Sequence, residues 1–288
     1  MTNKQLILSH IRSHIQPLEP VFTGQKASGV LKHDIFAVLF DIYGTLLISA
    51  SGDIDSASYD DCNLRYLFDR YNIGISVRKL REKLVRAIKK EHALLKIQGI
   101  DFPEVDIVKI WKEITYDTLA SNRVKDFVLE YELITNPVWP MPNLKKTIEA
   151  FNQRRMPMGI ISNAQFYTPL ILEAILESRI EDCGICPDLV FFSYIFSYAK
   201  PSEFMFDAAA SALKQLNILP KNVLYVGNDM LNDILPAKKT GFQTALFAGD
   251  MRSLRLREDN FQTKDVFPDL VITDLFQLVG HIESVKRI

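Results

Sequence analysis

The sequence has few cysteines, no long apolar run and no excess of one charge sign. The three cysteines, Cys62, Cys183 and Cys186, are too few and too unevenly spaced in 288 residues for a disulfide framework. No apolar run reaches the roughly 20 residues that a membrane-spanning helix needs, and the first residues contain no signal-peptide core. We therefore expect a cytoplasmic protein without a membrane partner.

The balance of charge argues against nucleic acid as a partner. The chain carries 34 Lys and Arg residues against 35 Asp and Glu residues, a formal net charge of −1. Sequence-independent binding to nucleic acid depends on basic residues that neutralise phosphates, so any site for an anion must be local. Hydrophobic residues make up 48% of the chain, which is enough to bury a core and excludes a disordered chain.

Strand-like apolar runs alternate with helical spacing over most of the chain. Residues 35–40 (IFAVLF) form a continuous apolar run that suits a strand buried on both faces. The other strand-like runs are 158–161, 189–192, 223–226, 244–247 and 270–272, and helical stretches are 169–178, 203–216 and 231–240. This alternation predicts an α/β fold with a doubly wound parallel sheet.

One long segment departs from the alternating pattern. Between residues 51 and 135 apolar side chains recur at intervals of three and four, as at Leu80, Leu84 and Ile88, which predicts helices only. We therefore expect three parts: an N-terminal extension over 1–34, an α/β core domain over 35–50 and 136–288, and an all-helical domain inserted over 51–135.

Polar side chains capable of chemistry follow four of the strand-like runs. They are Asp41 with Thr45, Ser162 with Asn163, Lys200, and Asn228 with Asp229 and Asp233. Because the carboxyl ends of parallel strands open at one edge of a sheet, these groups are expected to meet in one crevice. A carboxylate nucleophile, hydroxyls and an ammonium suit the transfer of a negatively charged group. The further carboxylates suit a hard cation such as Mg²⁺.

Four short motifs, in this order along the chain, resemble those of the haloacid dehalogenase-like (HAD) hydrolase superfamily. They are DIYGT, which begins at Asp41, GIISNA around Ser162, AKPSEFMF around Lys200, and YVGNDMLND, which ends at Asp233. The resemblance extends from about residue 36 to residue 275, and the helical insertion stands where the first type of cap domain of that superfamily sits. It implies a Rossmann-like core with a helical cap.

The resemblance also implies a role for each motif residue. Asp41 would be the covalent nucleophile, Thr45 and Ser162 would position the transferred group next to Asn163, and Lys200 would clamp the anion. Besides Asp41, the residues implied as contacts of Mg²⁺ are the Tyr43 carbonyl, Asp229 and Asp233, with Asn228 as the alternative to Asp229.

Two departures from the family pattern leave the reaction open. Tyr43 stands where the phosphatases of the superfamily have a second Asp that acts as general acid and base, and tyrosine there is similar to the 2-haloacid dehalogenases. The acidic fourth motif is instead similar to the metal-dependent members. We favour a Mg²⁺-dependent phosphatase that acts on a small phosphorylated metabolite through an aspartyl phosphate. The alternatives are metal-free dehalogenation of a 2-haloacid and a catalytically weak protein that binds a phosphorylated ligand.

Overall fold

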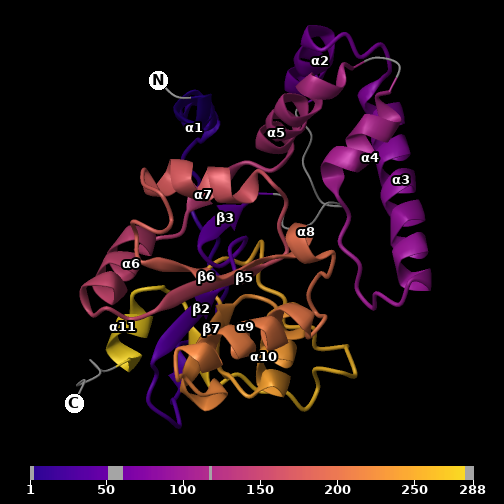
Figure 1. Cartoon of the computed structure of the whole chain (residues 1–288). Coiled ribbons are helices and arrows are strands. Elements are labelled where there is room, and N and C mark those ends of the chain that lie inside the picture. Colours follow the sequence, from indigo (N-terminus) through magenta and orange to yellow (C-terminus); the bar gives the residue numbers. More distant parts are fainter. Residues whose placement is uncertain (1–2, 51–60, 117–118, 283–288) are drawn as a thin grey trace.

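A computed structural model describes residues 3–50, 61–116 and 119–282 of the chain. In these residues a seven-stranded sheet with the order β1-β9-β8-β7-β2-β5-β6 forms the centre of the molecule (Figure 1). Its strands are β1 (Ser28–Gly29), β2 (Ala37–Phe40), β5 (Met158–Ser162), β6 (Ile185–Phe192), β7 (Val223–Gly227), β8 (Gln243–Phe247) and β9 (Leu270–Ile272). Neighbouring strands from β9 to β6 pair in parallel, which confirms the predicted fold class.

Two features of the sheet differ from the prediction. Strand β1 pairs antiparallel with β9, and its two residues lack the apolar run that announces the other strands. Strand β6 begins at Ile185 rather than at residue 189, because the exposed Pro187 and Asp188 interrupt its apolar run. Proline is tolerated at this place because β6 lies at the edge of the sheet, where a missing amide donor breaks no inner ladder.

Helices cover both faces of the sheet. Helices α6 (Leu144–Gln153), α7 (Thr168–Leu176) and α11 (Gln277–His281) lie on one face, and α9 (Phe204–Gln215) and α10 (Leu235–Thr240) lie on the other (Figure 1). Successive side chains of a strand point to opposite faces. Val38 and Phe40 of β2 therefore belong to the core beneath α6 and α7, whereas Ala37 and Leu39 belong to the core beneath α9. Burial on both faces explains the continuous apolar run of this strand.

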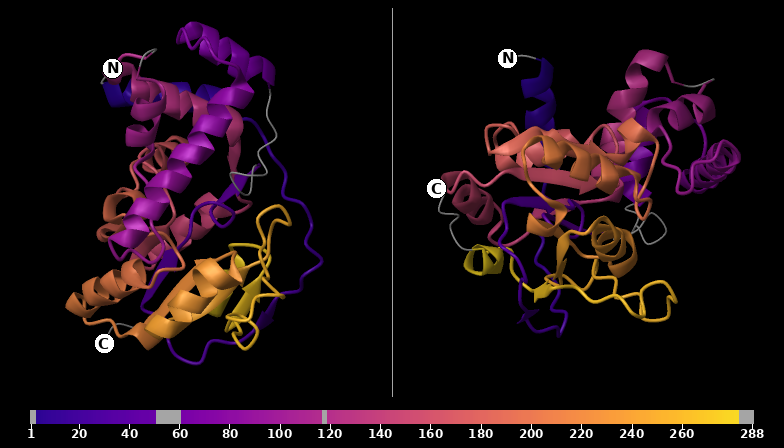
Figure 2. Two further views of the ribbon diagram at one scale, coloured as in Figure 1. Left: turned by 90° about the vertical axis from the view of Figure 1, so that its right-hand side faces the viewer. Right: turned by 60° about the horizontal axis from the view of Figure 1, so that its bottom comes forward.

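The N-terminal extension is part of the fold. Helix α1 (Asn3–His14) packs against α7, and Lys4 forms an ion pair of 2.7 Å with the largely buried Glu173. The segment that follows runs along the molecule to the far edge of the sheet (Figure 2). There Thr23 Oγ1 donates to the Ala248 carbonyl at 2.8 Å, and β1 adds to β9. The extension therefore connects α7, on one face of the sheet, with β9, near the edge of the sheet that β1 forms.

A helical insert, residues 61–135, separates β2 from β5 in the chain. Two short strands, β3 (Leu47–Ser49) and β4 (Val138–Pro140), pair antiparallel where the chain leaves and re-enters the core. The insert consists of α2 (Asp61–Arg70), α3 (Val77–Ile97), α4 (Ile107–Ile114), the short 3-10 turn η1 (Ser121–Arg123) and α5 (Val124–Thr135). Figures 1 and 2 show these helices as one unit beside the sheet. The predicted start of this domain, residues 51–60, lies outside the described residues.

Aromatic side chains form the centre of the helical insert. Phe127 of α5 is fully buried, and its ring lies 5.0 Å from that of Trp111 and 5.2 Å from that of Tyr71, between ring centroids. Capping residues begin two of the helices: Ser76 accepts from Lys79 N before α3, and Asp106 accepts from Val108 N before α4. The aromatic side chains belong to the same buried cluster as the face of the sheet beneath α6 and α7, so the insert packs continuously with the core. No helix in the described part of the chain is both long and apolar enough to cross a membrane.

Replacing Phe127 with alanine is expected to lower the free energy of unfolding by about 3 to 5 kcal/mol, because a fully buried ring leaves a cavity that its neighbours cannot fill. Urea unfolding followed by tryptophan fluorescence measures the change. Tyr116→Ala serves as the control, since this side chain is 83% exposed, and it should change the free energy by less than about 0.5 kcal/mol. Equal effects of the two substitutions would contradict the placement of Phe127.

Candidate active site

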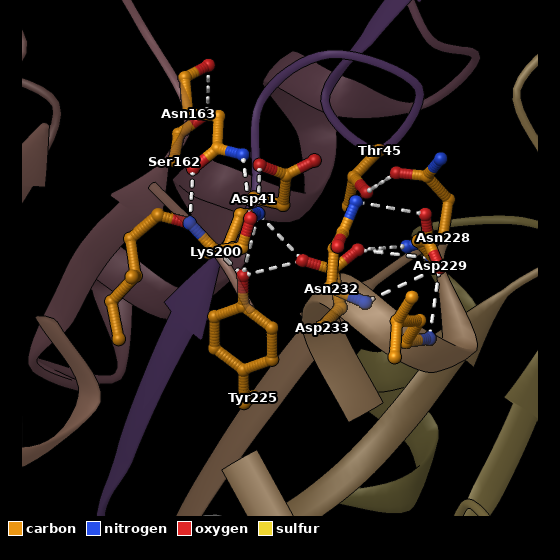
Figure 3. Close-up of polar contacts among 12 residues, drawn as sticks. Asp41, Thr45, Ser162, Asn163, Lys200, Tyr225, Asn228, Asp229, Asn232 and Asp233 are labelled. Atoms are coloured by element: carbon orange, nitrogen blue, oxygen red, sulfur yellow. Dashed lines mark hydrogen bonds and ion pairs between the residues drawn. The ribbon is translucent and has the colours of Figure 1, made fainter. Parts of the chain in front are cut away.

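The predicted site residues lie at the carboxyl ends of three adjacent strands. Strand β2 lies between β5 and β7, so that Asp41, Ser162 and Asn228 follow neighbouring strands at one edge of the sheet. Figure 3 shows these residues together with Lys200 and Asp233. A cavity of about 420 Å³ opens above them and is lined by residues of both the core and the helical insert. The crevice therefore lies at the end of the central strand, where the strand order reverses.

Lys200 joins two carboxylates inside this crevice. Its Nζ atom lies 2.6 Å from Asp41 Oδ1 and 2.6 Å from Asp233 Oδ1, and it also donates to the Tyr225 hydroxyl at 3.2 Å. The side chains of Lys200, Asp41 and Asp233 are each no more than 8% exposed. Burial by itself would lower the Lys200 pKa, but the charges of Asp233 and Asp41 raise that pKa above its usual value. The ammonium therefore stays charged between the two carboxylates.

A π-helical turn, η3 (Met230–Ile234), brings Asp233 back to the end of β7. Asp233 Oδ2 accepts from the backbone amides of Asn228 and Asp229, both at 3.0 Å. A Cβ atom on Gly227 would lie 2.4 Å from Asp233 Cγ, so this close approach requires glycine. Burial raises the pKa of Asp233, and the charge of Lys200 opposes that rise. Single π turns of this kind occur often at functional sites.

The other predicted residues hold the loops around this ion-paired centre. Asn163 Oδ1 accepts from the Lys200 amide at 2.7 Å and so holds the backbone that carries the ammonium. Thr45 Oγ1 donates to Asn228 Oδ1 at 3.0 Å. Thr45 and Ser162 are both fully buried, and the Ser162 hydroxyl lies 3.4 Å from the Asn163 carbonyl. The structure thus brings the four motifs together, with these two hydroxyls beneath the cavity surface.

Asp229 is paired with an arginine that the sequence motifs do not include. Arg257 binds its carboxylate in two places, with Nε 3.1 Å from Oδ1 and Nη2 2.6 Å from Oδ2. Asp229 also caps the π-helical turn by accepting from the Leu231 amide at 2.8 Å. The sequence offered a clue to this contact. Arg252, Arg255 and Arg257 follow the predicted strand 244–247, so they are expected at the same edge of the sheet as Asp229. Asp229 therefore serves as an ion-pair partner and a helix cap.

Tyr43 turns its hydroxyl toward the core rather than toward Asp41. The hydroxyl lies 3.1 Å from Thr168 Oγ1 at the start of α7, while the ring lines the cavity. Burial, with a smaller contribution from the charge of Glu132, raises the pKa of Tyr43 well above its usual value. A phenol with a raised pKa is a weak acid near neutral pH, so Tyr43 contributes shape and packing to the cavity.

The helical insert contributes to the cavity a carboxyl group, that of Glu132, that the sequence analysis did not predict. Glu132 of α5 lines the cavity, and its Oε1 atom accepts from Asn136 Nδ2 at 2.9 Å. Burial raises the pKa of Glu132, and hydrogen bonds from Asn136 and Tyr167 reduce the rise. A single glutamate in an amphipathic helix carries no recognisable signal. Only the fold shows that this one faces the crevice.

Glu104 is the other insert carboxyl group at the cavity, and it is held from several sides. Ser193 Oγ donates to Oε2 at 2.7 Å, and Gln165 Nε2 donates to Oε1 at 3.0 Å. The Val105 amide donates to Oε1 at 3.0 Å. Burial raises the pKa of Glu104 despite these three donors. Glu104 therefore ties the insert to the loops that follow β5 and β6.

The donor atoms of the crevice can be compared with the needs of Mg²⁺. In the described ranges no three or more His, Cys, Asp or Glu side chains are grouped as a metal site. Asp229 and Asp233 are engaged by Arg257 and Lys200. Asp41, Tyr43 and Asn228 line the cavity and offer the carboxylate, carbonyl and amide oxygens that suit this hard cation. These three residues fit Mg²⁺, whereas Asp229 would first have to release its arginine.

Comparison with known proteins identifies one family and similar solved structures. The protein family described as haloacid dehalogenase-like hydrolase matches residues 35–241. No curated protein matches the sequence significantly. The structure is similar to that of 2-haloacid dehalogenase from Pseudomonas syringae pv. Tomato DC3000, with 16% identity, a TM-score of 0.55, and 86% of this chain and 97% of that chain covered.

Two further solved structures are also similar to this chain. A HAD phosphatase from Thermococcus onnurineus has 20% identity and a TM-score of 0.48, with 85% of this chain and 97% of that chain covered. The L-2-haloacid dehalogenase from Xanthobacter autotrophicus with chloropropionic acid covalently bound has 18% identity and a TM-score of 0.48, with the same coverage of 85% and 97%. At these identities the structural similarities support the fold, and the reaction has to be argued from the crevice itself.

The raised pKa of Glu132 predicts how stability depends on pH. The folded protein keeps the Glu132 proton above the ordinary glutamate value of 4.5, where the unfolded chain has lost it. The free energy of unfolding of the wild type should therefore fall relative to that of Glu132→Gln as pH rises through this window. Urea unfolding of both proteins between pH 4 and pH 8, in steps of about half a unit, measures this difference.

Glu177→Gln is the control with the opposite sign. Glu177 is exposed, and its hydrogen bond with Lys145 lowers its pKa, so the wild type should gain slightly over this variant as pH rises. A wild-type advantage over Glu132→Gln that grows with pH would show that Glu132 is ionised in the folded protein.

Proposed function

Because the chain belongs to the haloacid dehalogenase-like hydrolase family, we propose that it is a phosphatase that acts on a small phosphorylated metabolite through an aspartyl phosphate on Asp41. The family match confirms the resemblance seen in the four sequence motifs. The observation that supports phosphate transfer is the charge of the crevice: Lys200 and Arg257 oppose the carboxylates of Asp41, Asp229 and Asp233. Arg81 and Arg255 also line the cavity, so its cationic side chains suit a phosphate dianion, and the closely spaced carboxylates suit a divalent cation that arrives with it.

Asp41 is positioned to act as the nucleophile. It follows the fully buried end of β2, its own amide donates to the Val226 carbonyl at 2.9 Å, and its side chain lines the cavity. One carboxylate oxygen attacks phosphorus while the bond to the leaving oxygen breaks, and water later hydrolyses the acyl phosphate. Lys200 lies 2.6 Å from the Asp41 carboxylate and would balance charge on the transferred group. Thr45 and Ser162 would hold the loops on either side.

Mg²⁺ would be held by Asp41, the Tyr43 carbonyl and Asn228, and we assign no direct contact to Asp229. Both oxygens of Asp229 accept hydrogen bonds from Arg257, and Oδ1 also caps the π-helical turn. Asp233 supports this arrangement by binding the amides of Asn228 and Asp229. When bound, Mg²⁺ would supply the positive charge that lets a phosphate dianion approach a carboxylate.

One observation favours dehalogenation of a small 2-haloacid as the second candidate. Arg81 of α3 lines the cavity from the side of the helical insert, where a guanidinium can hold a carboxylate or a departing halide. Tyr43 is compatible with this reaction, because halide leaves without a proton. The same nucleophile, Asp41, would attack carbon, and the reaction would proceed without Mg²⁺.

Hydrolysis of acetyl phosphate tests the proposed function. This substrate needs little help for its leaving group, so Mg²⁺-dependent turnover by the wild type is expected, with loss of that turnover in EDTA. Asp41→Asn should reduce the rate to that of the uncatalysed reaction, because the amide cannot form the acyl phosphate. Release of inorganic phosphate measures the rate, and near-ultraviolet circular dichroism checks that the variant is folded.

Halide release separates the two candidates. Chloride release from 2-chloropropionate in the presence of EDTA, lost in Asp41→Asn, together with no turnover of acetyl phosphate, would establish the dehalogenase instead. Turnover of neither compound would contradict both reactions and leave a protein that binds its ligand without converting it.

Two substitutions test the assignment of the metal contacts. Asn228→Asp adds a carboxylate where we place a metal-binding amide oxygen, and should lower the Mg²⁺ concentration for half-maximal activity by roughly tenfold, which corresponds to about 1.4 kcal/mol. Asp229→Asn should leave that concentration within about a factor of two, because Arg257 already occupies this carboxylate. The reverse pattern in a Mg²⁺ titration of acetyl phosphate hydrolysis would assign the metal to Asp229.

A further inference from the structure

The cavity offers few groups that could give a proton to a leaving group. Among its described lining residues there is no histidine or cysteine, and the carboxyl side chains are Asp41, Glu104, Glu132, Asp229 and Asp233. The three aspartates are each held in an ion pair, with Lys200 or with Arg257. Glu104 accepts three hydrogen bonds through its two oxygens, as described above. Glu132 accepts from Asn136 and is hydrogen bonded to the Tyr167 hydroxyl, so its two partners are neutral and fewer than the three of Glu104.

We propose that Glu132 is the catalytic acid that protonates the leaving oxygen of the substrate and then, as a carboxylate, accepts a proton from the attacking water. The inference rests on the proposed phosphatase function. It assigns to the helical insert a group that touches the reacting atoms, in addition to any part the insert has in selecting the substrate.

The position of Glu132 ties it to the segment that carries the nucleophile. Glu132 lies one helical turn before the end of α5, and Asn136, just after that end, donates to it at 2.9 Å. Asn136 in turn accepts at 2.7 Å from the Ser49 hydroxyl of β3, eight residues after Asp41. The Tyr167 hydroxyl is also hydrogen bonded to the Glu132 carboxyl group. These contacts fix the carboxyl group at the place where the insert joins the core.

The surroundings of Glu132 keep its proton available. The groups that face it are phenols and amides: Tyr43 and Tyr167 on the core side, and Asn136 on its own side. Burial raises the pKa of Glu132, so a larger fraction stays protonated near neutral pH than for an ordinary glutamate. A carboxyl group in this state can donate to an alkoxide, as a general acid must.

The proposed acid balances the two steps of the reaction. In the first, the Asp41 carboxylate forms a bond to phosphorus, the bond from phosphorus to the leaving oxygen breaks, and that oxygen takes the Glu132 proton to become an alcohol. In the second, water forms a bond to phosphorus, its proton passes to the Glu132 carboxylate, and the acyl phosphate bond breaks. The products are the alcohol and hydrogen phosphate, and both carboxyl groups return to their starting states.

The placement of the acid also indicates the class of substrate. Leu84, Ile88 and Trp111 of the insert also line the cavity, so an apolar organic group fits against them. A phosphomonoester of such an alcohol has a leaving group that departs poorly unless it is protonated. The site is therefore suited to alkyl phosphomonoesters with an apolar body as well as to acyl phosphates.

A pair of substrates with different leaving groups tests the inference. Benzyl phosphate releases an alkoxide that needs a proton, whereas p-nitrophenyl phosphate has a body of similar size and releases an anion that needs none. In Glu132→Gln we expect kcat for benzyl phosphate to fall about 100-fold or more, the usual contribution of a general acid, and kcat for p-nitrophenyl phosphate to change less than about threefold. The glutamine keeps the carbonyl that accepts from Asn136.

Glu104→Gln is the matched control. It makes the same substitution in the same cavity at a residue held by Ser193, Gln165 and Val105. Its ratio of kcat values for the two substrates should equal that of the wild type. A selective loss of benzyl phosphate hydrolysis in Glu132→Gln but not in Glu104→Gln would support the acid role.

Three outcomes overturn the inference and separate it from the proposed function. An unchanged ratio of kcat values in Glu132→Gln, with benzyl phosphate hydrolysed by the wild type, would show that the acid is another group. A wild type that hydrolyses acetyl phosphate and p-nitrophenyl phosphate but not benzyl phosphate has no working acid, which overturns the inference and leaves the phosphatase standing. A wild type that hydrolyses no phosphate compound overturns both.

Discussion

One buried ammonium group, that of Lys200, holds the carboxylates of Asp41 and Asp233 together, and the architecture of the crevice depends on it. Two carboxylates this close repel each other unless a cation lies between them, and a buried charge without its partner destabilises a protein by about 3 to 5 kcal/mol. The 2.6 Å contacts therefore couple the end of β2 to the turn after β7. The hydrogen bond from Asn163 to the Lys200 amide and the close approach at Gly227 serve this same arrangement.

Charge is divided between the two parts of the molecule. The core supplies the ionised groups at the strand ends, where backbone amides and ion pairs stabilise them. The helical insert supplies apolar side chains, Arg81 and the carboxyl groups of Glu104 and Glu132, whose pKa values burial raises. In the mechanism we propose, a neutral acid and a charged nucleophile need opposite surroundings, and placing them on separate units lets each have its own. The short β3–β4 sheet then determines how the two are brought together.

The parts of the structure with a local cause were predictable from the sequence, and the parts that depend on distant contacts were not. The run 35–40 announces a strand because both of its faces are buried, and the polar residues that follow four strands meet because parallel strands end at one edge. Arg257 lies outside the motifs, and Tyr225, which begins the fourth motif, had no predicted role. Only the fold brings these two residues to Asp229 and Lys200. The π-helical turn was equally hidden, since residues 231–240 read as an ordinary helix.

The difference between local and long-range causes also explains why a sequence motif can predict the wrong metal-binding residue. Asp229 has the residue type expected of a metal contact and lies beside the crevice, yet an arginine ten residues beyond β8 occupies both of its oxygens. Asn228 has the weaker ligand type but faces the cavity beside Asp41. Arg257 binds both oxygens of Asp229, whereas Lys200 binds one oxygen of Asp41, and Thr45 uses one of the two acceptor positions of the Asn228 amide oxygen. The bonds that a residue already makes, rather than its charge alone, therefore decide whether it can bind a cation. The local sequence specifies which oxygens are present, and the long-range ion pairs specify which of them remain available.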